Sequence, residues 1–232
     1  VSEGDLPLEI AAKQLQKDEI NILHTIGGDD TNTMAAALSN YLSENNYDLT
    51  VIGLPKTVDN DIIPIKQSLG ADTAADQGSI FFQNIVNENT SNPKTFIIHE
   101  VMGRHCGWLT AATARKYRSS LLNKGFNSSV LLHRESWDID AIYIPEMKID
   151  LNQEAIRLKH TMHDKGNVNI FISEGSCQEE ILTDMKNNNQ EIKKDAFGHV
   201  RLDKINPGLW LSNQFSSSIG AEKTLVQKSG YF

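Results

Sequence analysis

The chain has 232 residues, a formal net charge of −8 at pH 7, 39% hydrophobic residues and 22% charged residues. This composition is typical of a globular protein, and the length suffices for one large domain or two smaller ones with buried cores. The acidic balance argues against a general nucleic-acid binder, because binding to phosphate backbones needs clustered lysine and arginine. With only two cysteines, Cys106 and Cys177, neither a disulfide framework nor a zinc cluster is predicted, and we expect a reducing, cytoplasmic location.

No apolar run approaches the ~20 residues that a membrane-spanning helix needs, and the first residues are not a basic, apolar signal segment. We therefore expect no membrane partner. The chain starts without methionine and stops at Phe232 in the middle of a pattern. We expect it to be a part of a longer protein.

The first quarter of the chain predicts helices and strands in alternation. Apolar residues recur at helical spacing over residues 8–16 and again over 31–44. Short apolar runs at residues 20–26 and 49–54 are typical of buried strands, the first ending in two glycines and the second at Pro55. A strand, turn, helix and strand in this order predict a parallel sheet with crossover helices.

The same alternation continues along the rest of the chain. The further helices and strands are expected at residues 72–87, 95–101, 106–115, 141–144, 151–163 and 168–173. Residues 179–198 are polar and predict an exposed excursion, whereas residues 212–225 predict another helix. We expect a first domain over residues 1–70, a second over 71–205, and a return to the first over 206–232.

Residues 27–31, Gly-Gly-Asp-Asp-Thr, follow the first strand, at the edge of a parallel sheet where ligands bind. Glycine lets backbone N–H groups approach a phosphate and a helix N-terminus favours the anion, so Gly28 is a candidate phosphate contact. Asp29 and Asp30 would repel a bare phosphate, which implies a divalent cation such as Mg²⁺, with Asp29 as the metal-side acid. The alternative is a tight turn in which aspartate only caps the helix.

Residues 55–61, Pro-Lys-Thr-Val-Asp-Asn-Asp, follow the second strand. They gather acidic, amide and lysine side chains in one turn, which is more than a solvated turn needs. An alcohol that attacks phosphorus needs a base within hydrogen-bond reach, and a lysine such as Lys56 can stabilise charge on the transferring phosphoryl group. A solvated turn without a binding role is the alternative.

Two further turns give weaker signals. In residues 102–104, Gly103 lets a ligand approach and Arg104 can bind a phosphate or hydroxyl oxygen. Glu174 follows the last of the buried strands and would accept a hydrogen bond from a hydroxyl group. A surface arginine at a helix start is the alternative reading of Arg104.

Taken in order and with their spacing, these motifs resemble the phosphofructokinase family, and specifically its pyrophosphate-dependent branch. The motifs that carry the resemblance are residues 27–31, 55–61, 101–114, 145–146, 173–175 and 222–232. The family implies two Rossmann-like three-layer α/β/α domains with mostly parallel sheets and a site between them. It also implies reversible phosphorylation of fructose 6-phosphate to fructose 1,6-bisphosphate, with pyrophosphate and phosphate as the other substrate and product, and a dimeric or tetrameric homo-oligomer.

The resemblance implies a role for each matched residue. Asp59 matches the proton acceptor and Asp29 the Mg²⁺ position. The remaining matches to substrate-binding positions are Gly28, Thr57, Val58, Asp61, Met102, Gly103, Arg104, Glu174 and Tyr231.

The resemblance also implies the phosphoryl donor, because ATP-using relatives have glycine where this chain has Asp30 and Lys56. A carboxylate at position 30 would lie where the α-phosphate of a nucleotide binds. Two unit charges about 4 Å apart repel by about 4 kcal/mol at an effective dielectric constant of about 20, which is roughly a thousandfold in affinity. Pyrophosphate has no such third phosphate, and Lys56 can neutralise the leaving phosphate.

Some family features are missing, and other functions stay open. The glycine-rich N-terminal phosphate loop and the basic run after Tyr231 are absent, and Thr95 lies near where relatives that bind sugar across a subunit interface carry arginine. The alternatives are an ATP-dependent phosphofructokinase and a non-catalytic regulatory subunit, although a binding-only chain has no need of Asp59 and Lys56. A lipid or NAD kinase fits the later motifs poorly.

Overall fold

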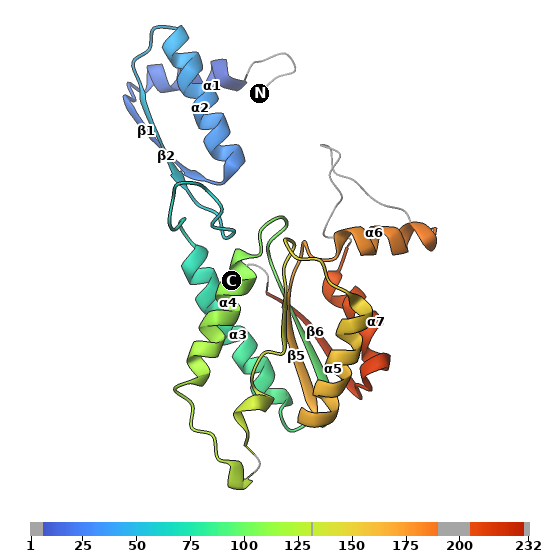
Figure 1. Cartoon of the computed structure of the whole chain (residues 1–232). Coiled ribbons are helices and arrows are strands. Elements are labelled where there is room, and N and C mark those ends of the chain that lie inside the picture. The colour runs from blue at the N-terminus through green and yellow to red at the C-terminus, as the bar shows by residue number, and fades with distance from the viewer. Residues whose placement is uncertain (1–6, 131, 190–204, 230–232) are drawn as a thin grey trace. The chain divides into compact units, whose positions relative to one another are not determined.

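The structure is a computed structural model that describes residues 7–130, 132–189 and 205–229. The chain divides into two compact units, Val1–Ala71 and Asp72–Phe232 (Figure 1). Every strand pair among the described residues is parallel. No helix in these ranges is both long enough and apolar enough to cross a bilayer.

The first unit is a two-stranded sheet with helices on one face. Its elements are α1 (Pro7–Lys17), β1 (Ile22–Gly27), α2 (Asp29–Glu44) and β2 (Thr50–Pro55). Its core is formed by Ala12, Leu38, Leu42 and Leu49. On the strands, Ile22, Ile26 and Ile52 point away from this core and are exposed, as the two-residue period of a strand requires.

The second unit is built on a four-stranded parallel sheet in the order β4, β5, β3, β6. The strands are β3 (Thr95–Val101), β4 (Ala141–Tyr143), β5 (Asn167–Ser173) and β6 (Lys223–Ser229). Every residue of the two central strands, β3 and β5, is buried. Four of the seven residues in each strand are apolar, as is typical of parallel strands covered on both faces, and the three polar residues of each strand are buried with them.

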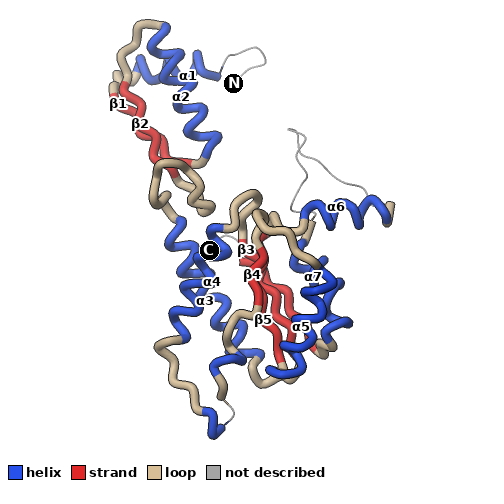
Figure 2. Tube along the Cα trace, viewed as in Figure 1, coloured by secondary structure: helices blue, strands red, loops and turns tan. Residues whose placement is uncertain are grey.

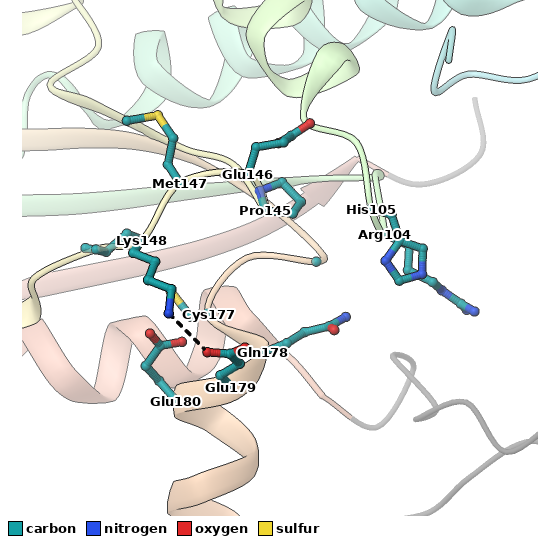
Figure 3. Close-up of a pocket in the computed structure, with 12 residues that line it drawn as sticks. Arg104, His105, Pro145, Glu146, Met147, Lys148, Cys177, Gln178, Glu179 and Glu180 are labelled. Carbon is teal, nitrogen blue, oxygen red and sulfur yellow. Dashed lines mark ion pairs between the residues drawn. The ribbon is translucent and has the colours of Figure 1, made fainter. Parts of the chain in front are cut away.

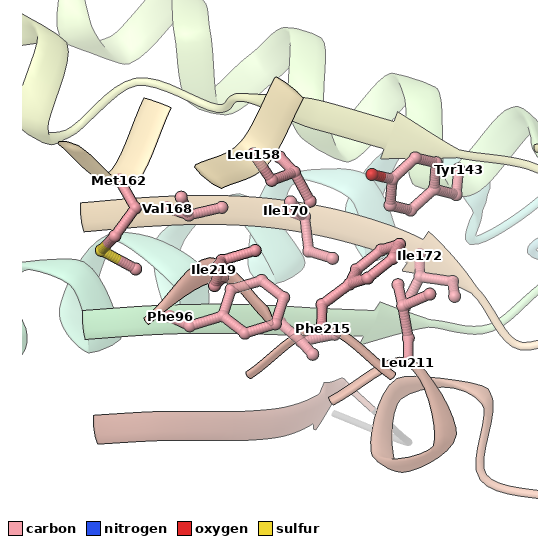
Figure 4. Close-up of a cluster of buried hydrophobic side chains, with 11 residues drawn as sticks. Phe96, Tyr143, Leu158, Met162, Val168, Ile170, Ile172, Leu211, Phe215 and Ile219 are labelled. Atoms are coloured by element: carbon pink, nitrogen blue, oxygen red, sulfur yellow. The ribbon is translucent and has the colours of Figure 1, made fainter. Parts of the chain in front are cut away.

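Helices cover both faces of this sheet (Figures 1 and 2). The four long ones are α3 (Ala71–Asn89), α4 (Trp108–Leu121), α5 (Leu151–Lys165) and α7 (Pro207–Ile219). On one face, Leu158 of α5 and Phe215 of α7 pack against Phe96 of β3 in the cluster of Figure 4. On the other face, Phe82 of α3 contacts the ring of Tyr117 of α4, with 4.8 Å between centroids. The prediction of an α/β fold with parallel sheets is confirmed.

Local sequence signals set the helix ends. The side chain of Asp150 accepts hydrogen bonds from the backbone N–H groups of Asn152 and Gln153, both at 3.1 Å, and so caps α5 at its start. Gly166 ends the same helix in the left-handed conformation, with φ of 80°, and donates its N–H to Met162.

Two sequence predictions differ from the structure in the last third of the chain. Part of the polar stretch expected as an excursion is helix α6 (Gln178–Asn187), because Ile181 packs with Ile205 on its apolar side. The helix expected over 212–225 ends at Ile219, and β6 follows. The left-handed Gly220, with φ of 74°, makes this break possible.

The expected return of residues 206–232 to the first domain also differs from the structure. Helix α7 packs on the second unit's sheet, and β6 pairs with β3 along its whole length, from Lys223 opposite Thr95 to Ser229 opposite Val101. Hydrogen bonding of β6 to a fully buried strand fixes this segment in the second unit.

His99 is a titratable group enclosed in the apolar interior of the second unit. Its ring lies 4.8 Å from that of Phe171 and 5.3 Å from that of Phe82, and the side chain is fully buried. Neither ring nitrogen has a hydrogen-bond partner among the described residues. Burial disfavours the charged imidazolium and lowers the pKa of His99 from 6.5 to about 3.

We predict that His99 makes folding acid-sensitive. Below pH 6.5, His99 binds a proton in the unfolded chain but stays neutral in the folded chain. The free energy of unfolding therefore falls as the pH drops towards 3. At pH 4.5 the loss from this one group is about 2–3 kcal/mol, since each pH unit costs about 1.4 kcal/mol. In urea unfolding at pH 7 and pH 4.5, His99→Leu should lose less stability on acidification than wild type, whereas His160→Gln, on the exposed face of α5, should not differ. Equal losses for wild type and His99→Leu would contradict the assignment.

Candidate functional site

The first turn leaves two aspartates at the start of a helix without a capping role. The N-cap of α2 is Gly28, and no side chain caps the helix there. Asn32 braces the turn instead, because its side-chain amide donates to the carbonyls of Gly27 and Gly28 at 2.8 and 2.9 Å. Asp29 and Asp30 are the first two helical residues, and both are exposed. The capping alternative is therefore not what the structure shows, and both carboxylates can face a ligand.

These two carboxylates fit a magnesium site of the kind that substrate phosphates complete. Mg²⁺ prefers oxygen ligands and is usually held by one or two carboxylates, substrate phosphates and water. Within the described residues, no group of three or more His, Cys, Asp or Glu side chains is arranged to hold a metal by itself. The donor set at Asp29 and Asp30 thus suits a cation that arrives with a phosphate ligand.

The second turn is fixed by hydrogen bonds to Asn60 and Ser68, neither of which is a predicted ligand. Asn60 adopts the left-handed conformation, with φ of 53°, which asparagine tolerates well. Its side chain accepts a hydrogen bond from the N–H of the buried Ser68 at 2.7 Å, and the Ser68 hydroxyl donates to the carbonyl of Thr57. The N–H of Asp59 donates to the Thr57 hydroxyl at 3.2 Å. This closed loop presents Asp59 from a fixed frame.

Parallel pairing brings the two turns of the first unit to one edge of its sheet. Gly27, the last residue of β1, lies opposite Pro55, the last residue of β2. The N–H of Lys56 donates to the carbonyl of Gly27 at 2.8 Å. A side chain at Gly27 would place its Cβ 2.3 Å from the hydroxyl of Thr31, so this close approach needs glycine. Both turns, which the sequence predicts to follow strands, therefore lie at one edge of this sheet.

At the corresponding edge of the second unit, the loop after β3 and the loop after β5 pack closely against each other at Gly103 and Gly175. Gly103 has φ of 143°, and its carbonyl accepts hydrogen bonds from the Ser173 hydroxyl at 2.6 Å and the Gly175 N–H at 3.1 Å. A Cβ at Gly175 would lie 1.8 Å from the carbonyl oxygen of Arg104. The N–H of Gly103 donates to the carboxylate of Glu174 at 3.4 Å. The predicted residues of these two loops are therefore held together as one rigid element.

A cavity of about 280 Å³ opens beside these loops (Figure 3). Glu146 accepts a hydrogen bond from the N–H of Gly107 at 2.8 Å and so anchors the start of α4 to the cavity wall. The guanidinium of Arg104 points away from the acidic side of the cavity, where Lys148 pairs with Glu179 at 3.6 Å in Figure 3. This orientation leaves Arg104 available to an anion outside the acidic wall.

Cys177 lines the same cavity but is a poor nucleophile. Burial, with a smaller effect from the Glu180 carboxylate, raises the pKa of its thiol to about 12. Because the thiolate is the reactive form, covalent chemistry at this cysteine is disfavoured near neutral pH.

A buried acid and a lysine brace the same sheet edge, and sequence reasoning missed both. Glu100 on β3 is 2% exposed and accepts a hydrogen bond from the N–H of Gly208 at 3.0 Å. The ammonium of Lys228 on β6 lies 2.6 Å from the other oxygen of Glu100 and 3.7 Å from the carboxylate of Glu174. Burial alone would lower the pKa of Lys228, but the interactions with Glu100 and then Glu174 outweigh it and raise that pKa. The ammonium of Lys228 thus lies beside Glu174, next to the Gly103 loop.

The predicted site residues fall into the two units. The first unit holds Gly28, Asp29, Asp30, Lys56, Thr57, Val58, Asp59 and Asp61, and the second holds Met102, Gly103, Arg104 and Glu174. Tyr231 lies outside the described residues. Asn32, Asn60, Glu100 and Lys228 were not predicted, because asparagine in a turn and a charged pair split across about 130 residues carry no local signal.

We predict that Lys228→Met destabilises the second unit by about 2–3 kcal/mol, because it leaves the buried carboxylate of Glu100 without its cation. Lys94→Met is the matched control: Lys94 pairs with Glu222, and both side chains are more than half exposed, so its loss should cost about 0.5 kcal/mol or less. Urea unfolding followed by tryptophan fluorescence measures both variants. Equal free energies of unfolding for the two variants would show that the Lys228–Glu100 pair contributes no more to stability than an exposed ion pair.

Comparisons with known proteins identify the family to which this chain is similar. The family model described as Phosphofructokinase matches residues 2–203. A "Pyrophosphate--fructose 6-phosphate 1-phosphotransferase" of Methylomonas methanica is 59% identical over the whole chain, and one of Mastigamoeba balamuthi is 54% identical over the whole chain. The chain spans 57% of the length of each of these relatives.

A crystal structure of a pyrophosphate-dependent phosphofructokinase from Marinobacter aquaeolei has the same fold, with a TM-score of 0.66 at 21% identity. The superposition covers 97% of this chain and 48% of that one. Since the family model covers most of the chain, and the turns that carry its motifs lie at the carboxyl edges of parallel sheets, the chain belongs to the phosphofructokinase family.

Proposed function

We propose that the complete protein containing this chain is a reversible, pyrophosphate-dependent 6-phosphofructokinase. It transfers a phosphoryl group from pyrophosphate to the 1-hydroxyl of fructose 6-phosphate, and forms fructose 1,6-bisphosphate and phosphate. The observation that carries the proposal is the pairing of two turns at one sheet edge, which puts Asp30 and Lys56 on adjoining turns of the first unit. The relatives that are 54–59% identical carry the same activity in their names.

In the proposed reaction, Asp59 accepts the proton of the sugar 1-hydroxyl as its oxygen attacks phosphorus. The bond from that phosphorus to the bridging oxygen breaks, and phosphate leaves. The frame around Asn60 and Ser68 keeps the base at a fixed position, which is the main way in which a protein assists phosphoryl transfer. Lys56 stabilises negative charge on the transferring and leaving phosphates.

The remaining matched residues bind substrate. Gly28 offers backbone to the pyrophosphate at the N-terminus of α2, and Thr57, Val58 and Asp61 line the turn that faces the sugar. In the second unit Met102, Gly103, Arg104 and Glu174 contact the sugar phosphate, and Tyr231 adds a further contact. Asp29 would hold Mg²⁺, which supplies charge neutralisation to the phosphates when bound.

Asp30 is the residue that we propose excludes ATP. Its side chain is exposed on the first unit, so its repulsion with a nucleotide α-phosphate lies between about 1 kcal/mol in open water and about 4 kcal/mol in a partly closed site. This range corresponds to about fivefold to a thousandfold in affinity. The second candidate function is an ATP-dependent phosphofructokinase, favoured only by the family membership that both activities share.

We further propose that the protein is a cytoplasmic homo-oligomer, a dimer or a tetramer, as the resemblance implies. The short edge strand β4 and the absence of a membrane-crossing helix in the described ranges are compatible with this proposal.

We expect Asp59→Ser to lower turnover with pyrophosphate by about 10²-fold or more, because the base is lost, while the affinity for fructose 6-phosphate changes little. Steady-state rates of the complete protein measure both quantities. Asp48→Ser removes an exposed carboxylate from the same unit and should keep full turnover. If Asp59→Ser retained turnover within about threefold of wild type, another group would have to be the base.

We expect Asp30→Gly to admit ATP as a donor, with a gain in kcat/KM for ATP of about tenfold or more, because the repulsive charge is removed. The same change should leave the helix intact, since Asn32 and not Asp30 braces the turn. Asp18→Gly removes a carboxylate at the end of α1 and should not admit ATP. No gain with ATP in Asp30→Gly would contradict the charge argument.

A further inference from the structure

A second set of basic side chains shares no residue with the proposed active site. Three arginines, Arg115 and Arg118 on α4 and Arg134 in the short 3₁₀ helix Arg134–Ser136, line one open depression of about 300 Å³. Ala114 of α4 and Ile142 of β4 contribute to its apolar floor. The arginines of α4 lie on one helix face, since positions three residues apart are neighbours there.

One of the three arginines is held in place by the protein itself. The Nε of Arg118 donates to a carboxylate oxygen of Asp138 at 2.7 Å, and its terminal nitrogen donates to the carbonyl of Ile139. These two bonds fix the orientation of the Arg118 guanidinium, and the carboxylate of Asp138 neutralises part of its charge. The position of this cation is therefore fixed before any ligand binds.

The other two arginines have no such partner in the described part of the chain. The Nε of Arg134 is buried and makes no hydrogen bond there, and neither Arg115 nor Arg134 forms an ion pair with a described carboxylate. A buried N–H without an acceptor costs about 1–3 kcal/mol, so such a group is uncommon. The chain has 30 acidic and 22 basic residues, which makes two unpaired arginines in one depression more notable.

The charges lining this depression favour an anion. The described residues that line this depression include three arginines and no acidic residue, and Asp138 pairs with Arg118 alone, so the local balance is positive on a chain whose formal net charge is −8. Arginine presents a planar fork of N–H donors that matches the oxygens of phosphate in two-pronged hydrogen bonds. The apolar floor suits the carbon frame of a small ligand rather than an extended polymer.

We propose that Arg115, Arg118 and Arg134 form a second anion site, which binds a small phosphate-bearing molecule. The site lies on the α4 side of the second unit, and none of its three arginines belongs to the motifs of the proposed active site. Arg118 supplies a fixed positive charge, and Arg115 and Arg134 supply guanidinium groups that pair with no described carboxylate. This site does not depend on which phosphoryl donor the enzyme uses.

Tungstate, which mimics phosphate and scatters anomalously, tests the site directly in crystals of the complete protein. We expect an anomalous peak within hydrogen-bond distance of Arg134 and Arg115. Tungstate found only at the Asp29 and Lys56 turns, at a concentration that saturates those turns, would overturn the proposal.

Calorimetric titration with inorganic phosphate tests the same site in solution. Wild type should show one more phosphate site than the double variant Arg115→Gln/Arg134→Gln, or bind at that site at least tenfold more tightly. Arg157→Gln, a control arginine that pairs with Glu154 on α5, should keep the wild-type number of sites. Identical titrations for wild type and double variant would overturn the proposal.

Turnover with pyrophosphate, measured on the same samples, keeps this test separate from that of the proposed function. The double variant should retain turnover in the absence of added anion, because neither of its two residues is among the predicted active-site residues. If the double variant does not fold, the tungstate experiment on wild type decides the question by itself.

Discussion

Parallel strand pairing is the constraint on which the rest of this molecule depends. Because β1 and β2 run in the same direction, the chain must leave both at one edge, and the register sets Gly27 beside Pro55. The same rule sets Val101 of β3 beside Ser173 of β5 in the second unit. Within each unit, the polar turns that follow the two paired strands are thus brought together by backbone hydrogen bonding, before any side chain contributes.

Glycines then let those turns approach more closely than other residues could. Gly27 must avoid the side chain of Thr31, and Gly175 must avoid the carbonyl of Arg104. Each contact is a place where a single methyl group would push the turn away from its neighbour. Charge is arranged on this frame by a few deeper groups: Glu100 fixes Lys228, and Lys228 in turn lies near Glu174. The rigidity of the edge and the placement of its charges therefore have separate physical origins.

The sequence was most informative where period and local chemistry agreed. Strand β3 is predicted with its true ends, since five of its seven residues are apolar or β-branched and such a short run leaves little ambiguity. Helix α6 was not predicted, because its apolar side is narrow and depends on contact with Ile205, far along the chain. The sequence predicts the first residues of β6 as the end of the preceding helix, because apolar and polar residues alternate only weakly along this strand. Only its pairing with β3 defines it as a strand.

The site shows the same division between local and distant information. Turn motifs such as residues 55–61 could be found by composition alone, and their convergence followed from parallel topology. The bonds that hold them could not be found in this way: Asn60 reaches Ser68, and Glu100 reaches Gly208 more than a hundred residues away. Such pairs become visible only when the chain is folded, because no spacing rule connects them.

The most direct test of the proposed activity uses the complete protein with fructose 6-phosphate and Mg²⁺, and compares initial rates with pyrophosphate and with ATP in parallel. We expect turnover with pyrophosphate, and a value of kcat/KM with ATP that is lower by about fivefold to a thousandfold, as the repulsion by the charge of Asp30 implies. Turnover with ATP at a similar rate would contradict the role of Asp30, and absence of turnover with both donors would contradict the proposed activity itself.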